Sequence, residues 1–555
     1  MTRTRATAAA FAALTLAGLL AVPAAAQPET STAITHEEND RVPEGAAWTQ
    51  HYFPSSDGSD TELHADVLLP EGRAPDEKLP VILSVGTYFG HAGQSEPEGW
   101  ARTGPSNRFQ DLVEGGDLFD RGYALVMVDL RGFGGSSGCL DFVGEGEQAD
   151  VRAAIDWAAS QPWSTGAVGM YGKSYDAITG LVGNNLDQDA LKAVVAQEPI
   201  WDLYRNIRSN GVPRTTIGNV ATSYARIATM PPLPDDDERY RANAEHEKAH
   251  PECLAQNESG YRIADPESEY WKTRDLAARA KGTDTPLFVT QGFLEWNTEP
   301  EAIQEFLDNH EGPQRGWLGP WDHVRGNDRV ADGRLAMGRE GWFEETMSFY
   351  DEHLKGITPP VEHPDFAIQD NTGAWRSQDT WPVVEKSTTV EFGGGSYVDH
   401  GGEADQTPGF LARSEPLAKA TRITGTPRVS LTAEGRGNVM VNLYDVAPDG
   451  TAVMFDEQVS LLKPGTTAFD LKSTDWTLAA GHSLAVEVGT IQPGGDWIDT
   501  PTHDTITVTA ASLDLALDDP ADDTPTQGGR APYLDLYLAG YTRPLPAGPA
   551  TFTLS

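Results

Sequence analysis

The chain has 555 residues, a formal net charge of −42 and two cysteines. This length allows several domains with a large buried core. The strong negative charge excludes nucleic acid and anionic membrane surfaces as expected partners, because their phosphate groups would be repelled.

The first 26 residues have the composition of a secretory signal peptide. Two arginines precede an apolar stretch over residues 6–22, and three alanines stand before Gln27. A membrane anchor is the alternative, but it needs a longer apolar run. We therefore expect a cleaved signal over residues 1–26 and a secreted protein with no membrane contact afterwards. Residues 27–46 are expected to be flexible.

The two cysteines, Cys139 and Cys253, predict one disulfide bond, since exported proteins fold under oxidising conditions. A bridge between them would close a long loop and stabilise the fold by roughly 4–5 kcal/mol in the chain-entropy model. Two free buried thiols are the alternative.

Strands and helices alternate over residues 27–197 and again over residues 285–361. Residues 63–69 alternate between apolar and polar side chains, which predicts a half-buried strand with His64 on its solvated face. Short apolar runs predict more buried strands, at residues 81–85, 125–128, 193–196 and 287–290. This order is typical of a mostly parallel sheet with helices on both faces, whose chemistry lies at the carboxyl ends of the strands.

Two regions break this rhythm. Residues 198–284 are polar with several helix-like runs, and we interpret them as a helical cap inserted between two strands. Beyond residue 362 helical periodicity disappears, and alternating segments such as Val429, Leu431 and Ala433 are separated by turn signals. This pattern predicts a β-sandwich over residues 362–555.

A candidate nucleophile stands between a strand and a helix. The apolar run 167–171 is followed by Gly172, Lys173 and Ser174, and then by helical spacing. A serine at such a tight turn forms a nucleophile elbow. The usual second glycine, two residues after the serine, is Asp176 here, and Ala177 is the next small residue.

A serine nucleophile needs a histidine base and an acid that orients it. In α/β-hydrolases the acid follows the serine in the sequence, and the histidine follows the acid. Glu295 comes soon after the strand at 287–290, and His323 follows a Gly-Pro-Trp turn further on. Asp322 is the rival acid, although adjacent side chains rarely face one another.

These motifs together resemble the X-Pro dipeptidyl-peptidase and cocaine-esterase family of serine hydrolases. The resemblance extends over nearly all of the chain after the signal. It rests on these segments: Gly172-Lys173-Ser174-Tyr175, Gly292 to Asn297, Gly319-Pro320-Trp321-x-His323, Asp129-x-Arg131-Gly132 with Gly135-Ser136-Ser137-Gly138, and Asp156-Trp157 with Gln161-Pro162-Trp163-Ser164-x-Gly166. It implies an α/β-hydrolase core, a helical cap and a C-terminal jelly-roll-like β-sandwich.

The resemblance also assigns roles to residues. It implies that Ser174 is the nucleophile, His323 the base and Glu295 the orienting acid, although the family usually has Asp at the last position. The oxyanion hole would consist of the backbone N–H of Tyr175 and the hydroxyl of Tyr88.

The substrate pocket is expected near residues 197–202, after a predicted strand. Trp201 is a candidate to stack on a proline ring or an aromatic acyl group. Glu198 and Asp202 are candidates to pair with a free amino terminus. The alternative is that these side chains pack the core and anchor the cap.

The implied activity is release of X-Pro dipeptides from peptide amino termini, without a cofactor or a metal. An esterase or acylase acting on small esters or amides is the first alternative. A zinc metalloprotease is more remote: His246-Glu247-Lys248-Ala249-His250 matches His-Glu-x-x-His, with Glu269 as a third ligand, but Pro251 follows at once. A binding protein that acts through its β-sandwich is a further alternative.

Overall fold

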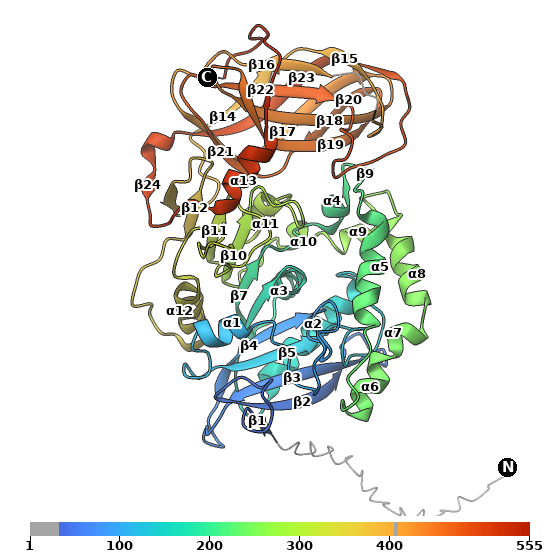
Figure 1. The fold of residues 1–555 in the computed structure, drawn as a ribbon, viewed down its shortest axis with the longest axis vertical. Helices are drawn as coiled ribbons and strands as arrows, with labels where there is room; N and C mark the ends of the chain where they lie inside the picture. The colour runs from blue at the N-terminus through green and yellow to red at the C-terminus, as the bar shows by residue number, and fades with distance from the viewer. Residues whose placement is uncertain (1–32, 405–408, 555) are drawn as a thin grey trace, which may run out of the picture. The chain divides into compact units, whose positions relative to one another are not determined.

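The computed structural model describes residues 33–404 and 409–554. The predicted signal peptide lies outside them. The larger sheet has twelve strands, of which those from β5 to β12 in the spatial order run parallel (Figure 1). In that order the strands are β1 (Ile34–Thr35), β2 (Ala46–Pro54), β3 (Glu62–Pro70), β5 (Ala124–Asp129), β4 (Leu79–Gly86), β6 (Ser164–Lys173), β7 (Leu191–Gln197), β10 (Leu287–Gly292), β11 (Gln314–Gly319), β12 (Phe366–Gln369), β13 (Trp375–Gln378) and β24 (Thr524–Pro525).

Helices cover both faces of this sheet. Alternate residues of a strand point to opposite faces, so Leu83 packs in one core with Leu181 of α3, while Ile82 packs in another with Met347 of α12. The central strands β4 and β5 are buried throughout, as parallel strands covered on both sides must be. The prediction of an α/β sheet is therefore confirmed. The covering helices are α1 (Gln110–Gly115), α2 (Glu145–Ser160), α3 (Tyr175–Asn185), α11 (Ile303–Asn309) and α12 (Trp342–Lys355).

The segment between β7 and β10 consists mainly of short helices. Asp202, Asp237 and Asp275 each accept hydrogen bonds from backbone N–H groups at a helix start, which is the usual role of Asp at an N-cap. No helix within 33–404 or 409–554 is long and apolar enough to span a bilayer. The elements are α4 (Leu203–Ile207), β8 (Arg208–Ser209), β9 (Val212–Pro213), α5 (Ile217–Ala228), α6 (Glu238–Ala244), α7 (His246–Ala249), α8 (Glu252–Tyr261), α9 (Glu269–Lys272) and α10 (Leu276–Arg279).

The C-terminal part has two antiparallel sheets that enclose their own core. Val429, Leu431 and Ala433, predicted from alternation to face inward, are all buried in it. One sheet contains β14 (Lys386–Glu391), β23 (Thr505–Asp518), β17 (Thr421–Glu434), β20 (Gly465–Asp470), β15 (Gly395–Val398) and β21 (Thr474–Leu478). The other contains β16 (Phe410–Arg413), β22 (Ser483–Gly489), β18 (Gly437–Val446), β19 (Thr451–Leu462) and β25 (Thr542–Pro544), and the helix α13 (Pro532–Tyr541) precedes β25.

The α/β sheet continues past the predicted boundary at residue 362. β12 pairs in parallel with β11, β13 pairs with β12, and β24 adds to β13, so all three belong to the α/β sheet. The first strand of the sandwich begins at Lys386. A short apolar strand has the same period of two in either sheet, so its sequence does not tell which sheet it joins.

One prediction about exposure is wrong, because His64, predicted to be solvated, is buried. In the segment predicted to be flexible the structure describes residues 33–46, where Val42 is fully buried and the Asn39 side chain donates to the backbone oxygen of Thr103 (2.8 Å). In both cases the covering residues come from distant parts of the chain.

Candidate active site

Ser174 occupies a strained turn between β6 and α3. Its backbone has φ 64° and ψ −124°, a conformation that non-glycine residues rarely adopt and that is typical of functional sites. A Cβ on Gly172 would lie 2.1 Å from the backbone oxygen of Asp176, so only glycine fits there. The predicted elbow is therefore present, and it holds the serine side chain at the carboxyl end of β6.

Asp176 stands where the short motif usually has glycine, and the structure accommodates it. Its carboxylate is buried and forms an ion pair with Arg108. Gly86 leaves the necessary room, because a Cβ there would lie 1.9 Å from Asp176 Oδ1. Arg108 also donates to the backbone oxygen of Lys173 (2.9 Å), so it supports both sides of the elbow. No motif in the sequence pointed to Arg108.

Glu295 and His323 are neighbours at the ends of adjacent parallel strands. Gly292 of β10 and Gly319 of β11 stand in register, and the loops that follow bring His323 Nδ1 to 3.2 Å from Glu295 Oε1. Asp322, the rival acid, instead accepts the backbone N–H of His323 (2.8 Å). This geometry favours Glu295 as the carboxylate that orients the imidazole.

The surroundings of Glu295 keep its carboxylate ionised. The side chain is buried, and it accepts the backbone N–H groups of Asn297, Thr298 and Glu299, each at 2.8 Å. Burial raises the pKa of Glu295, but the contact with His323 and the bonds from Thr298 and Asn297 outweigh this effect. The pKa of Glu295 therefore lies below its ordinary value.

The two predicted oxyanion donors lie after β4 and at the start of α3. The N–H of Tyr175 has no intrahelical acceptor, because Tyr175 is the first residue of the helix. The Tyr88 hydroxyl lies 2.8 Å from the hydroxyl of Tyr224 on α5, whose ring also packs against Tyr175 (5.2 Å between centroids). Tyr224 thus contacts the Tyr88 hydroxyl and the ring of Tyr175. The sequence analysis missed it because nothing distinguishes α5 from other polar helices.

The predicted substrate contacts after β7 are mostly structural. Trp201 is fully buried and donates from Nε1 to Gln291 Oε1 (2.7 Å), so it does not present its ring to a substrate. Asp202 is the N-cap of α4 and pairs with Arg205 (3.1 Å). These contacts agree with the alternative that the two residues pack the core and anchor the cap.

Glu198 is likewise fully buried, and it joins three loops. It accepts the backbone N–H of Gly292 (3.0 Å) and Nε1–H of Trp321 (3.0 Å), although it was expected to face a substrate amine. Burial, together with the nearby charge of Glu295, raises the pKa of Glu198 well above its ordinary value. Through these hydrogen bonds the Glu198 carboxyl helps to fix the positions of the loops that carry Glu295 and His323.

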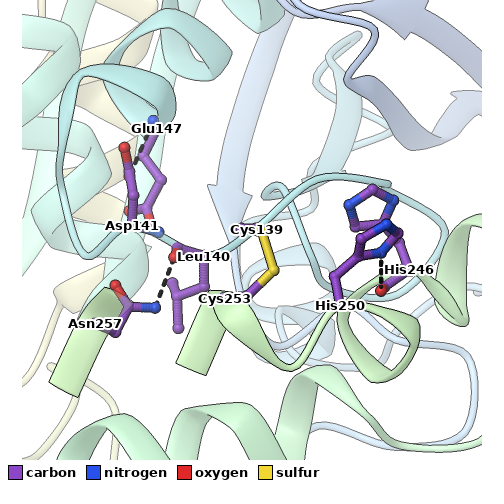
Figure 2. The surroundings of a disulfide bond; sticks show 8 residues. All are labelled: Cys139, Leu140, Asp141, Glu147, His246, His250, Cys253 and Asn257. Atoms are coloured by element: carbon purple, nitrogen blue, oxygen red, sulfur yellow. Dashed lines mark hydrogen bonds between the residues drawn. A yellow bond between two sulfur atoms is a disulfide. The ribbon is translucent and has the colours of Figure 1, made fainter. Parts of the chain in front are cut away.

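The His-Glu-x-x-His motif does not form a zinc-protease helix. α7 has only four residues, and the rings of His246 and His250 stack on each other at 4.1 Å (Figure 2). His250 Nδ1 is bonded to the backbone oxygen of His246 (2.8 Å). Among the described residues, no third ligand completes a three-ligand cluster with these histidines.

Close to these histidines, the predicted disulfide is present. Cys139 follows β5 and Cys253 lies in the first turn of α8, with 5.2 Å between their Cα atoms (Figure 2). A hydrogen bond from Asn257 Nδ2 to the backbone oxygen of Leu140 (2.7 Å) reinforces the same junction. The α/β core and the helical segment are therefore covalently joined.

Comparison with known families gives two matches. Residues 57–325, which include Ser174, Glu295 and His323, match the X-Pro dipeptidyl-peptidase (S15 family). Residues 361–527 match the X-Pro dipeptidyl-peptidase C-terminal non-catalytic domain.

The individual relatives have low sequence identity to this chain, but the similarity extends over most of its length. A putative Xaa-Pro dipeptidyl-peptidase of Streptomyces avermitilis is 24% identical, over 98% of this chain and 89% of that protein. Cocaine esterase of a Rhodococcus species is 25% identical, over 78% of this chain and 89% of that protein. Among solved structures, an α-amino acid ester hydrolase matches with a TM-score of 0.59 and 18% identity, covering 85% of this chain and 97% of that one. An aminopeptidase of a Thaumarchaeota archaeon matches with a TM-score of 0.62 and 17% identity, covering 89% and 99%, and both structures indicate the same fold.

Proposed function

The chain belongs to the X-Pro dipeptidyl-peptidase S15 and CocE/NonD hydrolase family and is a serine hydrolase, and we propose that it releases X-Pro dipeptides from peptide amino termini through Ser174. The observation that carries the proposed site is the serine in a strained elbow after β6, with a buried glutamate after β10 that lies 3.2 Å from a histidine after the adjacent strand β11. This is the constellation that acyl transfer requires.

In the acylation step, Ser174 Oγ attacks the carbonyl carbon of the scissile bond while His323 takes the hydroxyl proton. Glu295 stabilises the resulting imidazolium and fixes the ring through Nδ1. The carbonyl oxygen gains a negative charge, which the N–H of Tyr175 and the hydroxyl of Tyr88 would stabilise. Removing one such donor typically costs about 3–4 kcal/mol of barrier.

The intermediate collapses when His323 gives its proton to the leaving amine. An ester-linked acyl-enzyme remains on Ser174, and the amine departs with the rest of the peptide. Water then attacks the same carbonyl with His323 again as base, and the returned proton frees Ser174. The elbow and the oxyanion donors serve both halves of the reaction.

The choice of peptide over ester substrates rests on the extent of similarity. The relative that covers 98% of this chain is named a putative Xaa-Pro dipeptidyl-peptidase, and the C-terminal part matches the domain that accompanies that activity. An esterase or acylase with the same catalytic residues is the second candidate, favoured by the similarity to cocaine esterase.

Hydrolysis of an Ala-Pro chromogenic amide and of a simple aryl ester, by wild type and Ser174→Ala, tests both candidates. The proposed peptidase cleaves the amide, and the variant cleaves neither substrate. Cleavage of the ester alone would replace the peptidase with an esterase or acylase. Activity retained by Ser174→Ala would refute the nucleophile.

Export of the protein is a separate proposal. It is supported by the charge and hydropathy pattern of residues 1–26 and by the Cys139–Cys253 disulfide, a bond that persists in oxidising compartments. Amino-terminal sequencing of protein from the culture medium should begin at Gln27. Protein found only inside the cell with an intact amino terminus would contradict export.

A further inference from the structure

Two histidines and an aspartate form a buried cluster away from Ser174. His64 and Asp66 lie two residues apart on β3 and so point to the same face of the sheet, and His91 comes from the loop after β4. Their exposed fractions are 1%, 1% and 0%. The proposed reaction uses none of these side chains.

The spacing of the three side chains fits a shared metal ion. His91 Nε2 lies 3.3 Å from Asp66 Oδ2, and His64 Nε2 lies 3.8 Å from Asp66 Oδ1. One ligand atom from each residue lies within 4.8 Å of the others. A tetrahedral zinc site with bonds of about 2.1 Å holds neighbouring ligand atoms about 3.4 Å apart. Gln50 Oε1, 3.2 Å from His64 Nε2, offers a fourth, oxygen ligand.

The outer contacts of both histidines have the pattern found around metal sites. His64 Nδ1 lies 2.9 Å from Asp129 Oδ2, and His91 Nδ1 lies 2.7 Å from Asp236 Oδ1. Each ring thus uses Nδ1 toward an outer carboxylate and turns Nε2 toward Asp66. A metal-bound histidine usually donates its other ring N–H to a carboxylate in this way.

Charge also favours a cation at this position. Asp66, Asp129 and Asp236 are all buried, and burying carboxylates costs free energy unless positive charge accompanies them. Arg41, which approaches the same region, donates to the backbone oxygens of His91 and Arg102. Burial lowers the pKa of His91, but Asp66 and Asp236 outweigh this effect and raise it to about 10, so a divalent ion would take the place of the proton on His91 in offsetting this negative charge.

We propose that His64, Asp66 and His91 bind one divalent transition-metal ion, with zinc the expected ion because two imidazoles and a carboxylate suit it. The site has a structural role. It would fasten β3 to the loop that carries Tyr88, three residues before His91, and through Asp236 to the segment before α6. His91 also lines a small pocket together with Gly90, Pro231 and Tyr240.

Metal content of the purified protein tests the site directly. The protein is stripped with a chelator, exposed to excess ZnCl2, desalted and analysed by plasma mass spectrometry. Wild type should retain one zinc per chain, and the His64→Gln/His91→Gln double variant should retain none. Asp236→Asn should bind zinc roughly 10–100-fold more weakly in competition with a chromophoric chelator.

The pair His246 and His250 provides the matched control, since it removes two histidines from a different place. Because zinc that binds only the folded protein stabilises it, ZnCl2 should raise the melting temperature of wild type. His246→Gln/His250→Gln should keep both the full zinc content and this rise. Wild-type protein that retains no zinc after desalting, or loss of zinc in this control alone, would overturn the proposal.

If the His64 and His91 variants misfold, wild-type protein alone can still test the site, with cobalt in place of zinc. The proposed ligands predict the visible absorption spectrum of tetrahedral cobalt without a thiolate band. Wild-type protein that binds no cobalt, or binds it with a thiolate band, contradicts the assignment.

Discussion

Lys472 Nζ lies 2.9 Å from Glu299 Oε1, and this ion pair connects the β-sandwich to the loop of the proposed catalytic acid. Glu299 is fully buried and has φ 59°, a left-handed conformation that is costly for a residue with a side chain. Its backbone N–H donates to Glu295 Oε2 (2.8 Å). The sandwich therefore helps to hold the carboxylate that orients His323.

Lys472→Met should reduce stability and turnover together. It leaves the buried charge of Glu299 without its closest partner, and breaking a buried pair typically costs about 3–5 kcal/mol. Lys472→Arg should restore part of both quantities. Lys419→Met serves as the control, because it removes an ion pair of an exposed lysine with Asp519, whose loss should have little effect on stability. Denaturant unfolding and kcat measure the effects, and equal results for Lys472→Met and Lys419→Met would contradict this role.

Changes at the proposed triad should affect chemistry with little effect on folding. Ser174→Ala and His323→Ala should abolish covalent labelling by a serine-directed phosphonate. Glu295→Gln should lower kcat by about 10⁴-fold, as loss of the orienting carboxylate does in other triads. Asp322→Asn is the matched control and should retain most activity, because Asp322 contacts the backbone of His323. If Asp322→Asn were the more damaging change, the acid would be misassigned.

Arg108→Met should destabilise the elbow by leaving Asp176 buried without its partner. Burial raises the pKa of Asp176 above its ordinary value even though Arg108 opposes the shift, so the carboxylate depends on this contact. The double variant Arg108→Met/Asp176→Gly should recover stability, since it removes both charges and restores the small residue typical of the motif. Urea unfolding of the two single variants and the double variant measures the coupling between Arg108 and Asp176. If the stability changes of the two single variants simply add up in the double variant, the two residues are not coupled.

Lys173 predicts a dependence of stability on pH. Burial, assisted by the charge of Arg108, lowers the pKa of Lys173 from 10.5 to about 8. Between these two values the unfolded chain binds more protons than the folded one, so stability should rise with pH. Lys173→Met should remove this rise between pH 8 and 10.5, whereas Lys192→Met, at an exposed lysine, should not. Parallel curves for wild type and Lys173→Met in urea unfolding would be inconsistent with the shift.

The disulfide should account for a large part of the stability of the helical segment. A bridge over a separation of 114 residues stabilises by up to about 5 kcal/mol in the chain-entropy model. Cys139→Ser/Cys253→Ser should therefore have a lower melting temperature, and denatured, unreduced wild type should show no reactive thiol. Two titratable thiols would rule out the bond in the isolated protein.

Local sequence was sufficient for the elbow. A strand, a glycine, a serine and a helix follow one another within about twenty residues, and the strained φ of Ser174 arises from that short stretch. Glu295 and His323 were predictable for a similar reason, since parallel strands bring their carboxyl ends to one edge of the sheet.

Other residues took their roles only from neighbours distant in the chain. Trp201 follows a strand end, as a pocket residue would, yet Gln291 and the core surround it. His64 and Asp66 alternate with apolar residues as on a solvated face, yet His91 and Tyr240 cover them. In the sequence Lys472 resembles an ordinary surface lysine of a turn, and only the folded structure pairs it with Glu299.

The sequence by itself determined the order of strands and helices, the nucleophile turn and the candidate acid and base. Hydrophobic periodicity and turn chemistry act over a few residues, so they can be read without knowing the fold. Only the tertiary structure decided which polar side chains are buried, which carboxylates share a partner and which loops the sandwich supports. Burial and charge pairing depend on what covers each face, and the covering residues here come from far along the chain.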